Sequence, residues 1–298
     1  MIDFAELNRF EIYRENASSL HNDYVYKYAL PFERIENPVE ITRFLQRHWY
    51  HTITISAVYF GLIKAIQHWM KDRPAFDLQK PLFLWNAVLA VFSIVGLLRF
   101  SEDFVYSVLN DDLYHLLCYS VHPNSVAAFW SLLFAASKIV ELGDTLFIVL
   151  RKRPLIFLHY YHHAAVLIYT VHSGAEHTAP GRIFIVMNYF AHSVMYTYYA
   201  ITASGVKLPK WVSMSVTSIQ LGQMLAGVFV TFVVYKIKAD NSLTILTQTP
   251  KTDGFRCQQS MGNLYLAFII YVTFALLFIQ FFVNNYFRKS HKKLTKTE

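Results

Sequence analysis

Three histidines stand close together in a stretch of the chain that is otherwise apolar. His159, His162 and His163 lie between the apolar residues 155–158 and 164–169. In a helix, residues three and four positions apart share one face, and three imidazoles on one face of an apolar helix are costly to bury. Neutral imidazoles can bind a metal ion, or they can carry out acid–base and covalent acyl chemistry. The histidines alone leave both kinds of chemistry open.

Three charged residues at helical spacing precede the histidines. Lys138, Glu141 and Asp144 lie three positions apart in another apolar stretch, and Thr145 follows them. Charges inside a membrane protein face a bundle interior or a water-filled cavity, and they tend to pair. We expect Glu141 and Asp144, more than Lys138, to have the structural role of buried ion-pair partners that hold helices together.

Two more apolar stretches carry polar side chains that recur along one helix face. Asn188 and His192 are four positions apart, so a fourth histidine shares a face with an amide. Thr217, Gln220 and Gln223 recur at every third position. Such stripes can hydrogen-bond neighbouring helices, or they can line a polar ligand. The tyrosines that follow His192 are expected to pack as interfacial or core aromatic residues.

A basic triplet, Arg151, Lys152 and Arg153, directly precedes the histidine stretch. Basic residues at the cytosolic end of a membrane helix follow from the positive-inside rule. The same side chains could bind the phosphates of a cosubstrate at the mouth of a cavity.

The composition indicates a polytopic membrane protein. Of the 298 residues, 54% are hydrophobic and 16% are charged, whereas a soluble domain has about 25% charged residues. Mean hydropathy is +0.29. The net charge is +7, but the basic residues are spread between the apolar runs, so they indicate topology and not a nucleic-acid surface. Two cysteines are too few for a disulfide scaffold or a cysteine zinc site, and no cleaved signal peptide is expected.

Seven apolar runs have about the 20 residues that a membrane-spanning helix needs. Residues 100–124 contain four acidic residues and are expected to form a loop, part of it re-entrant. We expect one transmembrane domain over residues 48–288, an N-terminal segment over 1–47 and a basic tail over 289–298. The expected helices are residues 49–69, 81–99, 125–150, 155–174, 182–204, 211–235 and 262–287.

The distribution of Lys and Arg predicts the orientation of the bundle. The tail and the loops on its side carry more of these residues than the other side, which favours a cytosolic C-terminus and a lumenal N-terminal segment. Cys118 and Cys257 then fall in loops that face the oxidising lumen, where they could form a disulfide. The sequon at Asn16 would lie on the same side, as a candidate N-glycosylation site.

Four motifs together resemble the ELO family of very-long-chain fatty acid elongases, the 3-oxoacyl-CoA synthases of the endoplasmic reticulum. All four occur in the family's order and spacing, and the seven apolar runs extend the similarity over nearly the whole chain. Residues 158–169, which include the histidine motif, and residues 181–189, which include Asn188, resemble the branch that favours saturated and monounsaturated acyl chains. The motifs are Lys138-x-x-Glu141-x-x-Asp144-Thr145, His159-x-x-His162-His163, His192-x-x-Met195-Tyr196-x-Tyr198-Tyr199 and Thr217-x-x-Gln220-x-x-Gln223.

The resemblance implies an all-α membrane protein with seven transmembrane helices. Six of them would form two inverted three-helix units around an acyl tunnel that is open to the cytosol and closed at the lumen. It also implies a reaction in which long-chain acyl-CoA and malonyl-CoA give 3-oxoacyl-CoA, CO2 and free CoA. A tunnel closed at one end buries the acyl tail at about 0.8 kcal/mol per methylene, so its length can measure chain length.

The resemblance further implies roles for individual residues. His162 takes the acyl group as an acyl-imidazole, and the enolate formed by decarboxylation of malonyl-CoA attacks that group. His192 lies beside the reacting carbon, while His159 and His163 orient His162 or move protons. The residues expected to bind acyl-CoA or malonyl-CoA are Lys138, Arg151, Lys152, Asn188, Tyr198, Thr217, Gln220, Gln223 and Arg288.

By the same resemblance, the condensation needs neither a cofactor nor a metal. The expected partners are acyl-CoA, malonyl-CoA, membrane lipid and the reductase, dehydratase and enoyl reductase of the elongation cycle, with a homodimer as a candidate assembly. The expected localisation is the endoplasmic reticulum membrane. It rests on the family, because the tail has Lys296 at the third-last position without the dilysine pair that many members carry.

Two other functions remain open at the level of sequence. Membrane di-iron desaturases and hydroxylases also carry a His-x-x-His-His motif, but they need several such motifs to fill the coordination shells of two metal ions, and this chain has one. Seven helices with a lumenal N-terminus also describe receptors and transporters, since a fold does not fix a function. The histidines, Lys138 and the glutamine stripe favour an enzyme.

Overall fold

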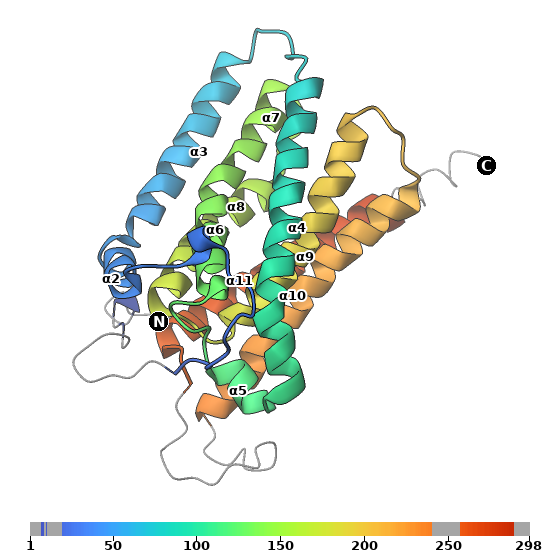
Figure 1. Cartoon of the computed structure of the whole chain (residues 1–298). Helices are drawn as coiled ribbons and strands as arrows, with labels where there is room; N and C mark the ends of the chain where they lie inside the picture. The colour runs from blue at the N-terminus through green and yellow to red at the C-terminus, as the bar shows by residue number, and fades with distance from the viewer. Residues whose placement is uncertain (1–6, 9, 11–19, 240–256, 289–298) are drawn as a thin grey trace.

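The computed structural model describes residues 7–8, 10, 20–239 and 257–288. Every named element in these residues is a helix (Figure 1). Two of the short elements are 3₁₀ turns, and η3 is a π-helical continuation of α11. In chain order the elements are η1 (Pro31–Glu33), α2 (Pro38–His48), α3 (His51–Trp69), α4 (Gln79–Asn110), α5 (Leu113–Cys118), α6 (Val126–Val140), η2 (Glu141–Gly143), α7 (Asp144–Leu150), α8 (Phe157–Glu176), α9 (Gly181–Ala203), α10 (Lys210–Ala239), α11 (Met261–Phe282) and η3 (Val283–Arg288).

Each of the seven apolar runs is helical. The runs correspond to α3, α4, the α6–η2–α7 unit, α8, α9, α10 and α11. Within the described residues, α4, α10 and α11 with its continuation are long and apolar enough to cross a membrane. The chain is therefore a multi-pass membrane protein. The other helices have a lower hydropathy or are interrupted, since α8 and α9 carry the histidines and a 3₁₀ turn separates α6 from α7.

The prediction of a loop over residues 100–124 is wrong for much of that stretch. α4 continues to Asn110, and α5 follows almost directly. Asp103 is only 1% exposed, and its buried charge is compensated by Arg182 of α9, whose Nη1 lies 3.7 Å from its Oδ2. Asp112 starts α5 by accepting a hydrogen bond from the backbone N–H of His115 at 2.8 Å, as an N-cap residue does. Of the four acidic residues that suggest a loop, Asp103 is thus paired with a distant partner and Asp112 is used as a cap.

A close approach of α4 to α9 determines how the bundle packs. The ring of Tyr189 on α9 lies against Gly96 of α4, where a Cβ atom would overlap it. Tyr189 is 1% exposed, and its hydroxyl donates to the carbonyl oxygen of Trp130 at 2.9 Å. One tyrosine therefore joins α4, α9 and α6.

An aromatic cluster joins α8, α9, α10 and α11. It contains Tyr169, Phe184, Tyr271 and Phe274, which are all buried. The ring of Tyr271 lies so close to Gly227 of α10 that a Cβ atom would overlap it. α10 and α11 run side by side in Figure 1, and this contact brings them together.

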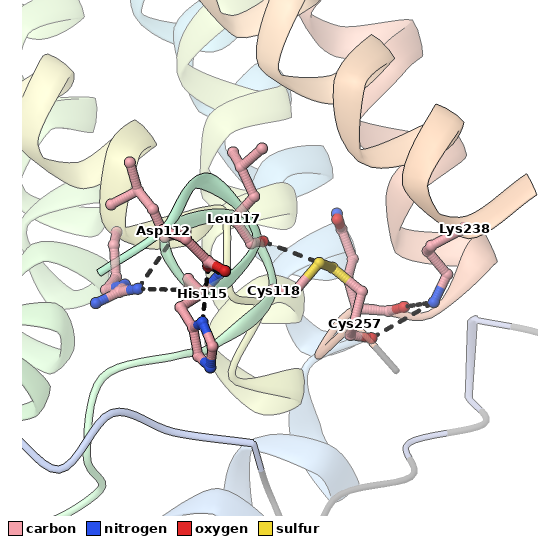
Figure 2. The surroundings of a disulfide bond; sticks show 9 residues. Asp112, His115, Leu117, Cys118, Lys238 and Cys257 are labelled. Atoms are coloured by element: carbon pink, nitrogen blue, oxygen red, sulfur yellow. Dashed lines mark hydrogen bonds and ion pairs between the residues drawn. A yellow bond between two sulfur atoms is a disulfide. The ribbon is translucent and has the colours of Figure 1, made fainter. Parts of the chain in front are cut away.

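A disulfide joins the end of α5 to the segment before α11. The sulfur atoms of Cys118 and Cys257 are 2.15 Å apart, and Figure 2 shows the bond with its neighbours. Next to it, the backbone N–H of Gln258 donates to the carbonyl oxygen of Cys118 at 3.0 Å. Lys238 at the end of α10 donates to the carbonyl oxygen of Gln259. Asn16, the candidate glycosylation site, lies outside the described residues.

Replacing Gly227 with alanine is expected to destabilise the packing of α10 on α11. The added Cβ would overlap the Tyr271 ring, and overpacking of a filled core costs about 1–3 kcal/mol. Gly222 in the same helix is the matched control, because a Cβ there meets nothing within 4 Å. The apparent Tm of the purified protein in detergent should fall for Gly227→Ala and not for Gly222→Ala. Equal melting temperatures for the two variants would contradict this tight contact.

Candidate active site

A cavity of about 690 Å³ lies between α4, α7, α8, α9, α10 and α11. We call it the site cavity. It brings together residues that are spread over more than a hundred positions of the sequence. The predicted site residues that line it are Asp144, His159, His162, His163, His192, Asn188, Arg151, Gln220 and Gln223.

A buried ion pair supports one wall of the site cavity. Lys138 is 2% exposed, and its Nζ donates to Glu141 Oε1 at 2.8 Å and to Asn188 Oδ1 at 2.9 Å. Glu141 Oε1 also lies 3.6 Å from His192 Nδ1. A buried charge is tolerated when such partners compensate it. Lys138 itself is not among the lining residues, so it acts on the cavity through the orientation of Asn188.

Asp144 is the centre of a second hydrogen-bond network. Trp85 Nε1 of α4 donates to its Oδ1 at 2.6 Å, and the hydroxyl of Tyr196 donates to its Oδ2 at 2.8 Å. His163 Nε2 lies 3.9 Å from Oδ2. The indole ring can approach because Gly143 leaves room, and a Cβ there would lie 2.7 Å from the ring. These bonds connect α4, α7 and α9 at one carboxylate.

The 3₁₀ turn η2 explains why Glu141 and Asp144 point the same way. In a 3₁₀ helix, side chains three positions apart are eclipsed, whereas an α-helix offsets them by part of a turn. Glu141 begins this turn and Asp144 follows it. The irregular segment therefore directs both carboxylates towards the histidines of α8 and α9.

The four histidines differ in how the protein holds them. His159 Nε2 is 3.0 Å from Thr145 Oγ1, and His163 and His192 lie beside the carboxylates described above. His162 Nδ1 is buried and has no hydrogen-bond partner among the described residues, and its ring centroid is 4.7 Å from that of Phe274. In the part of the chain that the structure describes, no three His, Cys, Asp or Glu side chains are grouped so that they could hold a metal ion.

The backbone conformation at Lys152 separates this lysine from the two arginines of the basic triplet. Lys152 has a φ of +52°, in the left-handed region that side chains other than glycine seldom adopt. Arg151 and Arg153 on either side of it both line the site cavity. The two arginines on either side of the left-handed Lys152 thus line one cavity.

The α3–α4 connection braces the same turn. The backbone N–H of Phe76 donates to the carbonyl oxygen of Leu150 at 3.0 Å. Lys152 Nζ donates to the carbonyl oxygen of Lys71 at 3.1 Å, away from the cavity. Two hydrogen bonds therefore hold the turn that carries the arginines.

Several predicted binding residues lie away from the site cavity. Thr217 Oγ1 is 3.1 Å from the hydroxyl of Tyr286, and Tyr198 packs on its neighbour Tyr199 with ring centroids 5.4 Å apart. Neither Thr217, Tyr198 nor Lys152 is a lining residue. The side chain of Arg288 lies outside the description of the structure.

Other residues line the site cavity beyond those assigned a specific role from the sequence. Tyr196 and Tyr199 line it, although the tyrosines were expected to be packing residues, and Arg153 lines it as a member of the basic triplet that could bind phosphates. Asn86 of α4 also lines it. Asn86 stands in an apolar run just as Asn188 does, so the same criterion could have identified it. No pattern marks Trp85, whose role depends on the facing helix.

A second cavity of about 120 Å³, the distal cavity, lies between α2, α6, α8 and α9. Its lining is mostly apolar and includes Leu132, Phe134 and Ala135 of α6. On α9, Ile185 lines the distal cavity and Asn188 lines the site cavity, one helical turn apart. The two cavities therefore follow one another along the same helices.

The chain is similar in sequence to proteins named as fatty acid elongases. The chain is 59% identical over 288 residues to "Putative fatty acid elongase 4" of Caenorhabditis elegans, which covers 97% of this chain and 95% of the relative. It is 39% identical over 256 residues to human "Very long chain fatty acid elongase 3", covering 86% and 90% of the two chains. It is 39% identical over 264 residues to "Very long chain fatty acid elongase 6" of Drosophila melanogaster, covering 88% and 80%.

The family comparison covers nearly the whole bundle. The sequence model of the ELO family, described as the GNS1/SUR4 family, matches residues 44–294. This range includes every residue that lines the site cavity. The chain belongs to the ELO (GNS1/SUR4) family.

Proposed function

We propose that the chain is a condensing enzyme of fatty acid elongation, which joins a long-chain acyl-CoA to malonyl-CoA to give 3-oxoacyl-CoA, CO2 and CoA. Membership of the family and the names of the relatives, which are fatty acid elongases, support this reaction. The assignment of the site rests on one observation about His162. Among the four histidines, His162 alone has a buried ring nitrogen without a protein partner in the described residues.

The first half-reaction transfers the acyl group to His162. An imidazole nitrogen attacks the thioester carbonyl carbon, the C–S bond breaks, and the departing thiolate takes up the proton that the imidazole loses. This divides a difficult carbon–carbon condensation into two easier steps. Phe274 packs against the ring, which keeps water from the acyl-imidazole.

The second half-reaction forms the new carbon–carbon bond. Malonyl-CoA loses CO2, and the electron pair of the broken bond becomes an enolate that attacks the acyl carbon. The imidazole of His162 leaves with the C–N electron pair and takes up a proton. His192 is held by Glu141 and Asn188 by Lys138, so both are fixed groups that can stabilise the negative oxygen.

The two arginines at the mouth of the site cavity suit the CoA portion of the substrates. A guanidinium binds phosphate oxygens in a planar, bidentate arrangement that an ammonium cannot make. Arg151 and Arg153 line the cavity where α7 ends. We assign the phosphates of CoA to this turn and the thioester to the histidines deeper in the cavity, where Gln220 and Gln223 supply further polar groups.

The acyl tail extends from His162 towards the distal cavity. The mostly apolar lining and the adjacent positions of Ile185 and Asn188 on α9 support this path. Burial of each methylene contributes about 0.8 kcal/mol, so an apolar end wall limits the length of chain that binds well.

We also propose where the enzyme lies in the cell and how it crosses the membrane. Residues 48–288 form seven spanning helices, six of them in two inverted three-helix units. The enzyme lies in the endoplasmic reticulum membrane with its N-terminal segment in the lumen. The disulfide between Cys118 and Cys257 supports the orientation, because disulfides persist in an oxidising compartment. We propose that the condensation uses no cofactor and that the other enzymes of the elongation cycle are its partners.

The rival functions have no comparable support. A di-iron desaturase would use its histidines as metal ligands, whereas His159, His163 and His192 here have Thr145, Asp144 and Glu141 as neighbours. Membership of the ELO family and the naming of its members as elongases favour the enzyme over a receptor or a transporter.

The His162→Ala variant is expected to insert and fold but to lose condensation. In the parent protein, acyl-CoA alone should release one equivalent of CoA and leave a protein heavier by one acyl group in intact mass spectrometry. The variant should show neither, because the acyl acceptor is absent. If His162 acted only as a general acid or base, its replacement would lower the rate about 10²–10⁴-fold. The parent protein would then form no acyl adduct. Near-normal turnover in the variant would rule out the covalent mechanism.

Filling the distal cavity is expected to shorten the acyl chains that are elongated. The Ala135→Leu variant adds three carbons to the wall, and each methylene excluded should lower kcat/KM for the longest substrates about fourfold, while shorter substrates are unaffected. The matched control is Ala136→Leu, since Ala136 is an exposed neighbour on the same helix and lines neither cavity. A panel of acyl-CoAs of increasing length measures the effect. An unchanged length profile for Ala135→Leu would place the acyl tail elsewhere.

A further inference from the structure

One side chain of α3, a helix that carries none of the motif residues, reaches the histidines. Tyr59 is 7% exposed, and its hydroxyl lies 2.6 Å from Thr145 Oγ1 of α7. Thr145 is fully buried, and the same Oγ1 lies 3.0 Å from His159 Nε2 of α8. A continuous line of hydrogen bonds therefore runs from α3 through α7 to the site cavity.

The number of protons decides the direction of this line. A tyrosine hydroxyl and a threonine hydroxyl each have one proton to donate, and a neutral imidazole has one N–H. Among the described residues the Tyr59 hydroxyl has no hydrogen-bond partner other than Thr145, so it must donate to Thr145 to avoid leaving a buried donor unsatisfied. Thr145 then has its own proton left for His159 Nε2. Every group in the line is satisfied in this order only.

We infer that Tyr59 is a positioning residue, which through Thr145 fixes His159 as the neutral tautomer with its proton on Nδ1. The reverse order would require Nε2–H of His159 to donate to Thr145 and Thr145 to donate to Tyr59, and the Tyr59 proton would then have no acceptor in the described structure. Because Nε2 is an acceptor towards Thr145, Nδ1–H is the group that His159 can offer to a ligand in the cavity that it lines.

This tautomer gives His159 a specific chemical part. This assignment rests on the proposed function. In that reaction His159 donates a hydrogen bond to a substrate oxygen, such as the thioester carbonyl oxygen that becomes an oxyanion, and does not act as a general base. A donor held in advance by the protein loses little in reorganisation when the charge develops. The ring centroid of His163 lies 4.5 Å from that of His159, so the neighbouring imidazole packs against the ring that this line holds.

Removing the hydroxyl of Tyr59 tests this inference with the smallest change. Tyr59→Phe and Thr145→Val should each lower kcat about tenfold, with KM for acyl-CoA and malonyl-CoA within about twofold of the parent values. The double variant should be no slower than the single variants, because both interrupt one line. Thr145→Ser keeps the hydroxyl and should restore most of the rate.

The chain offers a matched control for the loss of a tyrosine–threonine hydrogen bond. The hydroxyl of Tyr161 lies 3.1 Å from Thr273 Oγ1, between α8 and α11, and that pair has no bond to a histidine. Tyr161→Phe should leave kcat unchanged. A loss of kcat in Tyr161→Phe equal to that in Tyr59→Phe would show a general packing effect and would overturn the inference.

A readout without turnover separates this inference from the proposed function. In ¹⁵N-histidine-labelled protein in membranes, the nitrogen signals that are lost in His159→Gln should report Nδ1–H for the parent and a shift towards Nε2–H for Thr145→Val, which removes the hydroxyl that donates to Nε2. An Nε2–H tautomer in the parent, or the same tautomer in both proteins, would refute the positioning role. Failure to find an acyl adduct on His162 would refute the covalent mechanism and leave the tautomer result standing.

Discussion

Lys138 and Glu141 carry opposite charges into an apolar interior, where each alone would cost several kcal/mol to bury. Together they are stable only in a narrow geometry, because each must also satisfy its remaining hydrogen-bonding groups. Lys138 does so with Asn188, and Glu141 does so near His192, both on α9. The pair on α6 and η2 thereby sets the position of α9. The register of the two helices, and with it one wall of the site cavity, follows from this constraint.

The four histidines of the site have different neighbours. A hydroxyl, Asp144 and Glu141 each stand beside one imidazole, and a phenyl ring stands beside the fourth. Polar partners reduce the freedom of an imidazole and fix its tautomer, whereas an aromatic neighbour leaves its lone pair uncommitted. The same residue type therefore acquires different chemical properties within one helix turn of α8. The distinction comes from α3, α7 and α11 and not from the histidine motif itself.

The helices and most polar residues of the cavity could be predicted from the sequence, because polar side chains at helical spacing in apolar runs have few other roles in a membrane. The partners across helices could not. Tyr59 and Trp85 look like ordinary packing aromatics, since their hydrogen bonds depend on which helix faces them. Asp103 suggested a loop because its partner Arg182 is distant in sequence. No sequence rule predicts the left-handed backbone of Lys152, which separates this lysine from the two arginines that line the cavity.

The bond between Cys118 and Cys257 closes a loop with a sequence separation of 139 residues. Every histidine of the site, both carboxylates and the two mouth arginines lie inside this loop. The chemical machinery is thus a macrocycle, with α3 and α4 attached at one end and α11 at the other. A peptide bond broken anywhere in the cycle leaves its two pieces covalently connected, so the site can tolerate a nick that would separate an open chain. The protein therefore stays covalently connected after one backbone cleavage between Cys118 and Cys257, as a cyclic polymer does and a linear one does not.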